Sequence, residues 1–175
     1  MQWEFSFLYA LQELHNPILD AIMVFITKLG DDGILWIAIG VICLLFKKHR
    51  KMGVQVLLSM LFTYIIGNLI LKNVFARPRP CDIDTTIAML ISRPHGHSFP
   101  SGHSMNGMVA AMALFLNNKK IGIPALILAV LIGFSRMYLF VHFPTDVLGG
   151  FAVAILVAIA VDFAIHKIQL KRTNA

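Results

Sequence analysis

Apolar residues along the chain occur in long stretches that short polar segments separate. Several of these stretches approach the roughly 20 apolar residues that a helix needs to cross a bilayer. The pattern predicts an all-α integral membrane protein, a bundle of about five transmembrane helices. The five stretches cover residues 34–46, 52–71, 104–116, 121–140 and 147–165.

The N-terminal region follows a different pattern. Residues 3–14 mix Trp, Phe and Leu with Gln and Glu, which is typical of an amphipathic helix at the membrane interface. Residues 17–29 are apolar, but Asp20 and Lys28 interrupt them, and at about 1.5 Å per residue they barely span a bilayer. We expect residues 1–29 to form interfacial or half-buried helices, with six spans in total at most.

Composition supports the membrane assignment. The 175 residues are 58% hydrophobic and only 14% charged, with a mean hydropathy of +0.76. This length suits a single domain over residues 1–175, and a soluble domain of that size could not hide so much apolar surface. A secretory signal peptide is not expected, because residues 1–16 lack a basic start. Cys43 and Cys81 should lie near opposite membrane faces, too far apart for a disulfide.

The net charge of +6 is explained by membrane topology rather than by a nucleic-acid partner. Lys and Arg concentrate in short loops between the apolar stretches, as the positive-inside rule predicts for cytoplasmic loops. These basic loops alternate in phase along the chain and cover residues 47–51, 119–120 and 166–172. The opposite, non-cytoplasmic face then receives the turn at 30–33 and the loops at 72–100 and 141–146.

Three polar clusters lie on this non-cytoplasmic face. They run from Lys72 to Pro80, from Pro100 to His103, and from Ser135 to Asp146. Ionisable residues beside membrane spans are costly and indicate function by default. The residue types fit phosphate chemistry: cations and amide groups for the oxygens, a histidine nucleophile oriented by a carboxylate, and a second histidine for the leaving group. We therefore expect residues 72–100 to form an active-site loop.

The second cluster ends this polar loop and opens an apolar helix. Ser101 suits the N-cap of the helix, and Gly102 allows the backbone to approach a ligand closely. Free N–H groups at a helix start bind phosphate well, and His103 would project beside such an anion. A plain helix cap with a surface histidine is the alternative interpretation.

The third cluster pairs His142 with Asp146 across a loop-to-helix junction. A carboxylate at this spacing can accept the Nδ1–H of the histidine and leave Nε2 as the nucleophile. Asp146 also suits the first turn of a helix, and the two roles are compatible. Arg136 offers a planar fork for phosphate oxygens.

In the first cluster, Lys72 and Arg79 are candidate phosphate ligands at the mouth of a span. Snorkelling of these cations to the membrane interface is the alternative interpretation. The snorkelling interpretation is less favoured for Lys72 and Arg79, because the other two polar clusters lie on the same membrane face as these residues. For Arg77 the two interpretations have equal weight.

Together the clusters resemble the signature of the type-2 phosphatidic acid phosphatase family, K-x6-RP, PSGH and SR-x5-H-x3-D. The three parts occur in order over roughly the central half of the chain. Many bacterial members have six membrane helices, and this chain is similar to the short members, including bacterial undecaprenyl pyrophosphate phosphatases. The matching residues are Lys72, Arg79, Pro80, Pro100 to His103, Ser135, Arg136, His142 and Asp146.

The resemblance implies a lipid phosphate phosphatase that uses neither a metal nor a cofactor. His142, assisted by Asp146, would attack phosphorus to give a phosphohistidine, and His103 would protonate the departing oxygen and then activate water. The substrate would be a membrane lipid with a terminal phosphate, with undecaprenyl pyrophosphate favoured over phosphatidate and phosphatidylglycerophosphate. The phosphate oxygens would be held by Lys72, Arg79, Ser101, Gly102 and Arg136.

Two alternatives stay open at this point. His95, His97, His103 and His142 could form a zinc site. A small lipid transporter or flippase could bind a phosphate headgroup without hydrolysis, but transporters place polar groups near the midplane between broken helices. Here the polar clusters gather on one face of rarely interrupted spans. An enzyme of the cell membrane with its site on the non-cytoplasmic face is therefore the favoured interpretation.

Overall fold

A computed structural model describes residues 2–173, and all regular structure in that range is helical, which confirms the expected all-α class. The residues outside it are 1 and 174–175. The elements are α1 (Gln2–Gln12), α2 (Pro17–Lys28), η1 (Asp31–Gly33), α3 (Ile34–Leu45), η2 (Lys47–His49), α4 (Arg50–Thr63), η3 (Tyr64–Leu71), α5 (Lys72–Phe75), α6 (Pro80–Ile83), α7 (Gly102–Asn117), α8 (Lys119–Tyr138) and α9 (Pro144–Thr173).

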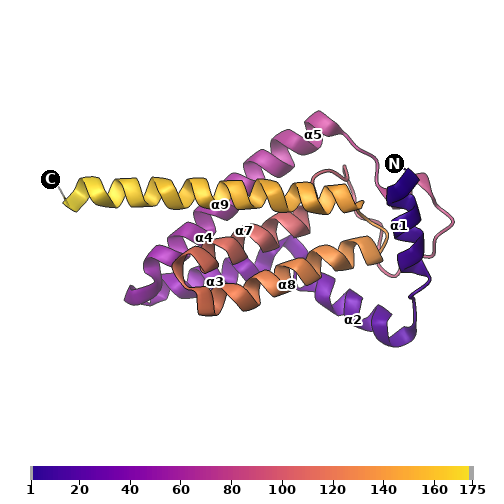
Figure 1. Cartoon of the computed structure of the whole chain (residues 1–175), viewed down its shortest axis with the longest axis horizontal. Helices are drawn as coiled ribbons and strands as arrows, with labels where there is room; N and C mark the ends of the chain where they lie inside the picture. Colours follow the sequence, from indigo (N-terminus) through magenta and orange to yellow (C-terminus); the bar gives the residue numbers. More distant parts are fainter. Residues whose placement is uncertain (1, 174–175) are drawn as a thin grey trace.

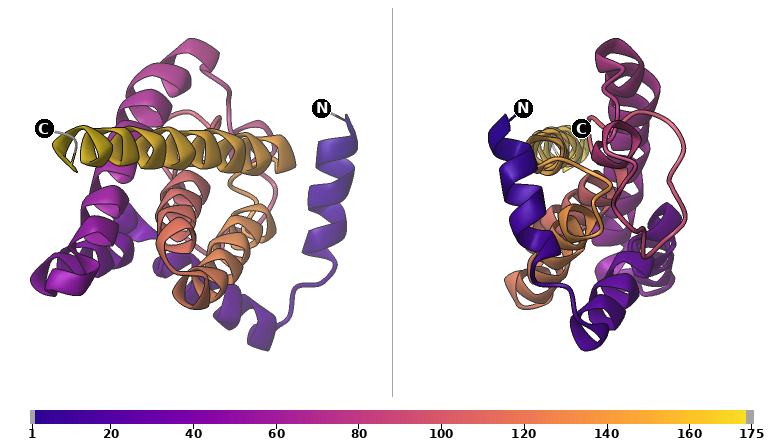
Figure 2. Two further views of the ribbon diagram at one scale, coloured as in Figure 1. Left: turned by 60° about the vertical axis from the view of Figure 1, so that its left-hand side comes forward. Right: turned by 90° about the vertical axis from the view of Figure 1, so that its right-hand side faces the viewer.

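Helix α7 is the centre of the bundle. It packs against α4, α8 and α9 and lies among them in Figures 1 and 2. Many of its residues are small and buried, as at Gly107, Ala110 and Ala111, and small side chains let membrane helices approach closely. Near the turn into α8, a Cβ on Gly122 would lie 2.1 Å from the Cα of Phe115, so only glycine fits there.

The lengths of the helices agree with a multi-pass membrane protein. Within the described residues, three helical segments are long and apolar enough to cross a membrane: Lys47–Ile83, Lys119–Tyr138 and Pro144–Lys171. Helix α3, with 12 residues, and α7, with 16, are shorter. Large apolar side chains stay exposed along the bundle, for example Leu148 and Leu156 on α9, which suits contact with lipid tails.

The N-terminal region forms the two helices that the sequence predicts, but α1 is packed more deeply than expected. Glu4, Leu8 and Leu11 are buried, because α1 lies across the end of the bundle (Figures 1 and 2), against the loop that follows α8. Helix α2 starts after Asn16, whose side-chain oxygen accepts the N–H of Leu19 at 3.0 Å. The carboxylate of Glu4 therefore lies inside the protein rather than in water.

The polar active-site loop begins later than the sequence suggests. Lys72 to Phe75 form helix α5, which continues from the π-helical turn η3. The helix ends only at Ala76, which has φ 42°, just ahead of the extended backbone that the residue before Pro78 favours. The loop thus starts at Ala76 rather than at Lys72, and a helix positions the lysine.

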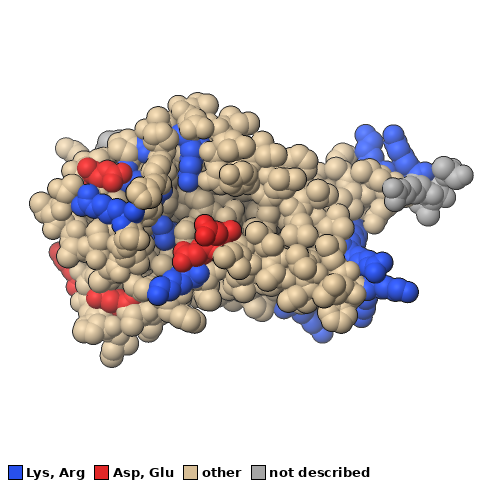
Figure 3. Space-filling model, turned by 180° about the vertical axis from the view of Figure 1, so that it is seen from behind, with Lys and Arg blue, Asp and Glu red and all other residues tan. Residues whose placement is uncertain are grey.

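Charged residues divide between the two ends of the molecule. In the view of Figure 3, the end near the C-terminus shows only Lys and Arg, whereas the other end shows both signs around a hollow. The α3–α4 and α7–α8 connections lie at the same end as the C-terminus (Figure 1). The three basic loops therefore share one end of the bundle, as the alternation of the sequence predicts.

Candidate active site

The three polar clusters meet at one cavity of about 330 Å³. Its walls come from η3 and α5, the active-site loop, the start of α7, the end of α8 and the loop before α9. Six of the residues proposed from sequence line it: Lys72, Arg79, Gly102, His103, Arg136 and His142. Further polar groups in the walls, which the motifs did not assign to a site, are Asp32, Tyr64, Asn68, His95 and Asn106.

The nucleophile candidate His142 lies on a loop, Leu139 to Phe143, that is buried along its whole length. Phe140 in this loop has a left-handed backbone with φ 58°, a costly conformation for a large side chain that only the surrounding packing stabilises. Nη1 of Arg79 lies 2.9 Å from Nε2 of His142. Because a guanidinium can only donate, Nε2 is the acceptor and the imidazole proton sits on Nδ1. A nucleophilic Nε2 requires this tautomer.

The electrostatic environment keeps His142 neutral. Burial is the main cause that lowers its pKa to about 3, and the positive charges of Arg79 and Arg136 act in the same direction, against the opposing effect of Asp146. The imidazole is therefore uncharged at neutral pH. Its Nε2 lone pair is available for attack without the loss of a proton.

Asp146 is fully buried in the first turn of α9. Its Oδ2 accepts the N–H of Phe143 at 2.8 Å and the hydroxyl of Ser98 at 2.5 Å. The same oxygen lies 3.7 Å from Nδ1 of His142, too far for a hydrogen bond, whereas Ser98 Oγ lies 3.3 Å from Nδ1. A bridge through Ser98 thus replaces the direct contact that the sequence predicts. Ser98 belongs to none of the motifs, and nothing in its sequence context indicates this position.

Arg79 connects the active-site loop to the nucleophile. It is only 3% exposed. Besides contacting His142, it donates to the backbone carbonyls of Gly96 at 2.9 Å, Val141 at 3.1 Å and His95 at 3.2 Å. The guanidinium therefore fixes the loop and the histidine relative to each other while it lines the cavity.

Three cations face the cavity: Lys72, Arg79 and Arg136. Nη1 of Arg136 donates to Oγ1 of Thr27 at 2.6 Å, while its buried Nε has no hydrogen-bond partner among the described residues. A buried donor without a partner is costly, and like charges this close repel one another. An anion with several oxygen acceptors would remove both costs.

The start of α7 contributes its backbone rather than the Ser101 side chain. Ser101 is fully buried, and its hydroxyl accepts the N–H of Ser104 at 3.5 Å and the Ser104 hydroxyl at 2.8 Å. The residue caps the helix as predicted, but the structure does not bring it to the cavity wall. Gly102 does line the cavity, and a Cβ there would lie 3.7 Å from Nζ of Lys72.

Arg77 is not a snorkelling cation, so that interpretation of it is wrong. Its Nη1 donates to Oδ1 of Asp146 at 2.6 Å and to Oγ1 of Thr145 at 2.7 Å. Its Nη2 donates to Oε2 of Glu4 at 2.7 Å, and its guanidinium carbon lies 4.1 Å from the centre of the Phe143 ring. Arg77 therefore joins α1 to the carboxylate of Asp146. Sequence alone could not decide between the two interpretations, because Glu4 lies far from Arg77 along the chain.

The candidate histidines do not assemble a metal site. No group of three or more His, Cys, Asp or Glu side chains in the described chain could hold a metal ion, so the zinc alternative finds no support. Instead, Nε2 of His103 lies 2.9 Å from Oδ1 of Asp31 in the turn η1. The sequence did not predict a role for Asp31, because Asp is a common residue in a turn such as the one at 30–33. Cys43 and Cys81 are both free, as expected.

These features place the chain in a known family. The PAP2 superfamily model matches residues 52–170, and the chain belongs to this superfamily. The matched region includes every signature residue of the three clusters. The resemblance seen in the motifs is thereby confirmed.

Known relatives extend the similarity beyond the motifs. An undecaprenyl-diphosphatase of Sulfolobus acidocaldarius is 35% identical over 133 residues, 75% of this chain but only 64% of the relative, slightly under two thirds of its length. Undecaprenyl-diphosphatase BcrC of Bacillus subtilis is 34% identical over 147 residues, covering 82% of this chain and 73% of the relative. A crystal structure of a transmembrane PAP2-type phosphatidylglycerolphosphate phosphatase from Bacillus subtilis superposes with a TM-score of 0.78 at 33% identity, covering 95% of this chain and 86% of that one.

The buried position of Arg77 leads to a test of its structural role. Arg77→Ala should lower the free energy of unfolding by about 3 kcal/mol, because it removes the cation between two buried carboxylates. Chemical denaturation in detergent measures this change, and Arg93→Ala, at an exposed arginine of the same loop, serves as the matched control. The loss should be less than additive with Glu4→Gln, since the two residues share one ion pair. Equal stability of the two arginine variants would contradict this role.

Proposed function

We propose that this protein hydrolyses the terminal phosphate of a membrane lipid through a phosphohistidine on His142, with undecaprenyl pyrophosphate as the favoured substrate. The observation that carries the proposal is the state of His142. It is neutral, it presents Nε2 toward Arg79, and it does so at a cavity with three cations. A nucleophile held beside a set of cations suits attack on a phosphate.

The reaction would proceed in two steps. Nε2 of His142 attacks the terminal phosphorus, the bond to the leaving oxygen breaks, and His103 gives that oxygen a proton. Water then attacks the phosphohistidine while His103 takes up its proton, which restores both histidines. Lys72, Arg79 and Arg136 would hold the phosphate oxygens and stabilise their charge in the transition state, in the place of a metal ion.

A lipid substrate is supported by the surface next to the cavity. An apolar groove of about 300 Å³, lined by Ile37, Leu57 and Leu61 among others, shares Tyr64 and Asn106 with the cavity wall. A lipid could place its phosphate among the cations while its tail stays in this groove and the bilayer. Relatives named as undecaprenyl-diphosphatases favour a polyprenyl diphosphate, and the phosphatidylglycerolphosphate phosphatase structure supports a broader range of lipid phosphates.

The topology that we propose has five spans, formed by the five apolar stretches predicted from sequence, with α1 at the membrane interface. The basic loops share one end of the bundle (Figure 1), which the positive-inside rule assigns to the cytoplasm. The cavity lies at the other end and would open on the non-cytoplasmic face of the cell membrane. A lipid of the outer leaflet would then reach it by lateral diffusion.

The nucleophile can be tested by substitution. His142→Ala should abolish phosphate release from undecaprenyl pyrophosphate while the protein keeps its elution profile in detergent. Asp146→Asn should retain a weaker activity, because the imidazole loses an orienting charge but keeps the Ser98 bridge. A folded His142→Ala protein with near-normal turnover would rule out this mechanism.

The substrate class follows from a comparison of catalytic efficiencies. We expect kcat/KM to be highest for undecaprenyl pyrophosphate, measurable for phosphatidate, and lowest for a water-soluble phosphate monoester, because nothing concentrates the soluble ester at the membrane. Phosphate release by the purified protein in detergent and in vesicles provides the measurement. A clear preference for the soluble ester would refute the lipid assignment.

The sidedness of the site can be read from cysteine labelling in intact cells. After both native cysteines are replaced, a Thr85→Cys variant should react with an impermeant thiol reagent, since this exposed residue belongs to the active-site loop. The matched variant Lys119→Cys, at the opposite end, should react only after the cells are opened. The reverse labelling pattern would overturn the proposed orientation.

A further inference from the structure

His103 has a carboxylate partner of its own, outside the three signature clusters. The partner is Asp31 in the turn η1, and its Oδ1 lies 2.9 Å from Nε2 of the imidazole. The contact joins residues 72 positions apart in the chain. Asp31 also lies outside the region 52–170 that defines the family match, so no motif assigns it a role.

The contact determines which nitrogen of His103 remains for chemistry. A carboxylate can only accept a hydrogen bond, so Nε2 must carry the proton in the neutral imidazole. Nδ1 is then the atom that gains and loses a proton. In His142 the two nitrogens have the opposite roles: Arg79 donates to Nε2, so the proton of that ring lies on Nδ1.

The turn is built to hold Asp31 against the ring. A Cβ on Gly30 would lie 2.9 Å from Cδ2 of His103 and 2.9 Å from Ile132 on α8, so the turn touches both neighbours. Asp32 and Gly33 follow with positive φ values of 49° and 68°, which reverse the chain into α3. The backbone that carries Asp31 therefore has little freedom to withdraw from His103.

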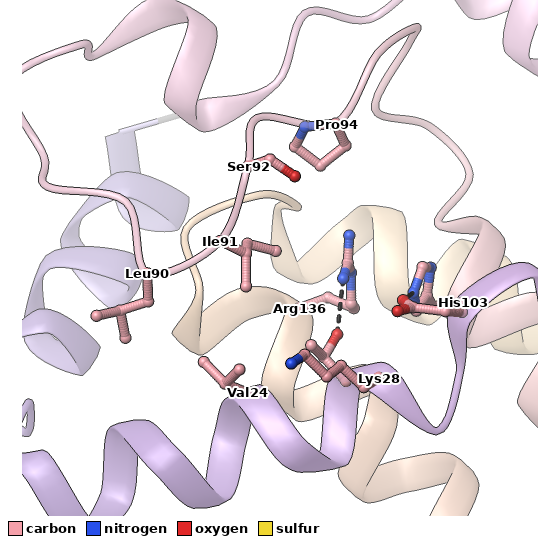
Figure 4. Close-up of a pocket in the computed structure, with 10 residues that line it drawn as sticks. Val24, Lys28, Leu90, Ile91, Ser92, Pro94, His103 and Arg136 are labelled. Carbon is pink, nitrogen blue, oxygen red and sulfur yellow. Dashed lines mark hydrogen bonds and ion pairs between the residues drawn. The ribbon is translucent and has the colours of Figure 1, made fainter.

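His103 lies between two cavities of the protein. Its ring and Arg136 line both the catalytic cavity and a second cavity of about 440 Å³ between α2 and the loop at 90–94. In Figure 4 both side chains project into the space between α2 and that loop. The histidine thus stands at the edge of the phosphate site rather than at its centre, whereas the nucleophile candidate His142 lines only the catalytic cavity.

We propose that Asp31 is the positioning residue of the general acid: it fixes Nε2 of His103 so that Nδ1 delivers the proton to the leaving oxygen. This inference rests on the proposed function. In the first step the P–O bond breaks, its electron pair stays on the leaving oxygen, and the proton on Nδ1 moves to that oxygen. In the second step water gives a proton to Nδ1 as its oxygen bonds to phosphorus, and the P–N bond electrons return to His142.

Charges around His103 explain why such a partner is needed. Burial is the main cause that lowers the pKa of His103, to about 4, and Arg136 on α8 lowers it further. Asp31, through its hydrogen bond and charge, and Asp32, through its charge alone, act in the opposite direction. Lys72, Arg79, His95 and His142 also face the catalytic cavity that His103 lines, and Lys28 of α2 faces the second cavity beside it. The negative charge of a bound lipid phosphate would raise the pKa of His103 again and favour the doubly protonated ring that the first step needs. Without Asp31 this imidazolium would hold its Nδ1 proton less well, and protonation of the leaving group would be slower.

The test compares leaving groups of different acidity. Hydrolysis of phosphatidate releases an alcohol, whose alkoxide is about as basic as hydroxide and needs a proton (water has a pKa of about 15.7). Hydrolysis of undecaprenyl pyrophosphate releases a phosphate monoester with a second pKa of about 6, which departs more easily. Loss of a residue that acts only through the general acid should therefore slow the hydrolysis of phosphatidate more than that of undecaprenyl pyrophosphate.

We expect Asp31→Asn to lower kcat on phosphatidate at least about tenfold more than on undecaprenyl pyrophosphate, within the range that general acids contribute, with little change in KM. Asp31→Glu should recover part of the loss. The control Asp32→Asn removes a charge from the same turn without a hydrogen bond to the ring. Because Asp32 acts on His103 through its charge alone, the difference between the two lipids should be clearly smaller in this variant than in Asp31→Asn. The basic limb of the kcat–pH profile should also move to lower pH in Asp31→Asn, because its His103 loses the proton sooner.

Equal losses on both lipids with an unmoved pH profile would overturn the positioning role and show a structural one. A gain in activity on removal of Asp31 would also contradict it, because the carboxylate would then compete with substrate for the histidine. If Asp31→Asn does not fold, the same two measurements on Asp31→Glu, the ratio of kcat on the two lipids and the basic limb of the kcat–pH profile, test the positioning role. Wild-type protein that releases phosphate from neither lipid would instead refute the proposed function, and this inference with it.

Discussion

The buried ion pair between Arg77 and Asp146 holds the active site together. Asp146 is fully buried, and a carboxylate in that position is tolerated only when a cation and hydrogen-bond donors satisfy it. Arg77 supplies the cation at 2.6 Å and reaches Glu4 of α1 at 2.7 Å with its other nitrogen. One guanidinium therefore ties the N-terminal helix, the active-site loop and the start of α9 into a single unit.

This arrangement explains why His142, the proposed nucleophile, can lie in a loop. Loops are usually exposed and mobile, yet Leu139 to Phe143 are buried because α1 covers them. Within that cover, Arg79 and Ser98 contact opposite nitrogens of His142 at 2.9 and 3.3 Å, and so fix both its orientation and its tautomer. In the proposed mechanism the attacking Nε2 would thus be positioned before substrate binds, as preorganised catalysis requires.

The sequence predicted the class of fold and the parts of the site whose chemistry is local. Long apolar stretches identify membrane helices regardless of their partners, and the spacing of His142 and Asp146 places them at one loop-to-helix junction. What sequence could not predict depends on pairs far apart in the chain. Arg77 finds Glu4 and His103 finds Asp31 only after α1 and the turn η1 fold back on the bundle. Ser101 is a case where a local signal predicted two roles and the structure shows one. Its hydroxyl caps helix α7 and therefore does not reach the cavity, where the sequence had also suggested a phosphate ligand.

In the proposed reaction the phosphoryl group passes through a covalent bond to Nε2 of His142. The most direct measurement is mass spectrometry of the protein quenched during turnover of undecaprenyl pyrophosphate, preferably in a His103→Asn variant that activates water poorly. We expect one added phosphoryl group on the peptide that contains His142, and none in a variant that also carries His142→Ala. Turnover without any phosphorylated histidine, or with the group on another residue, would contradict it.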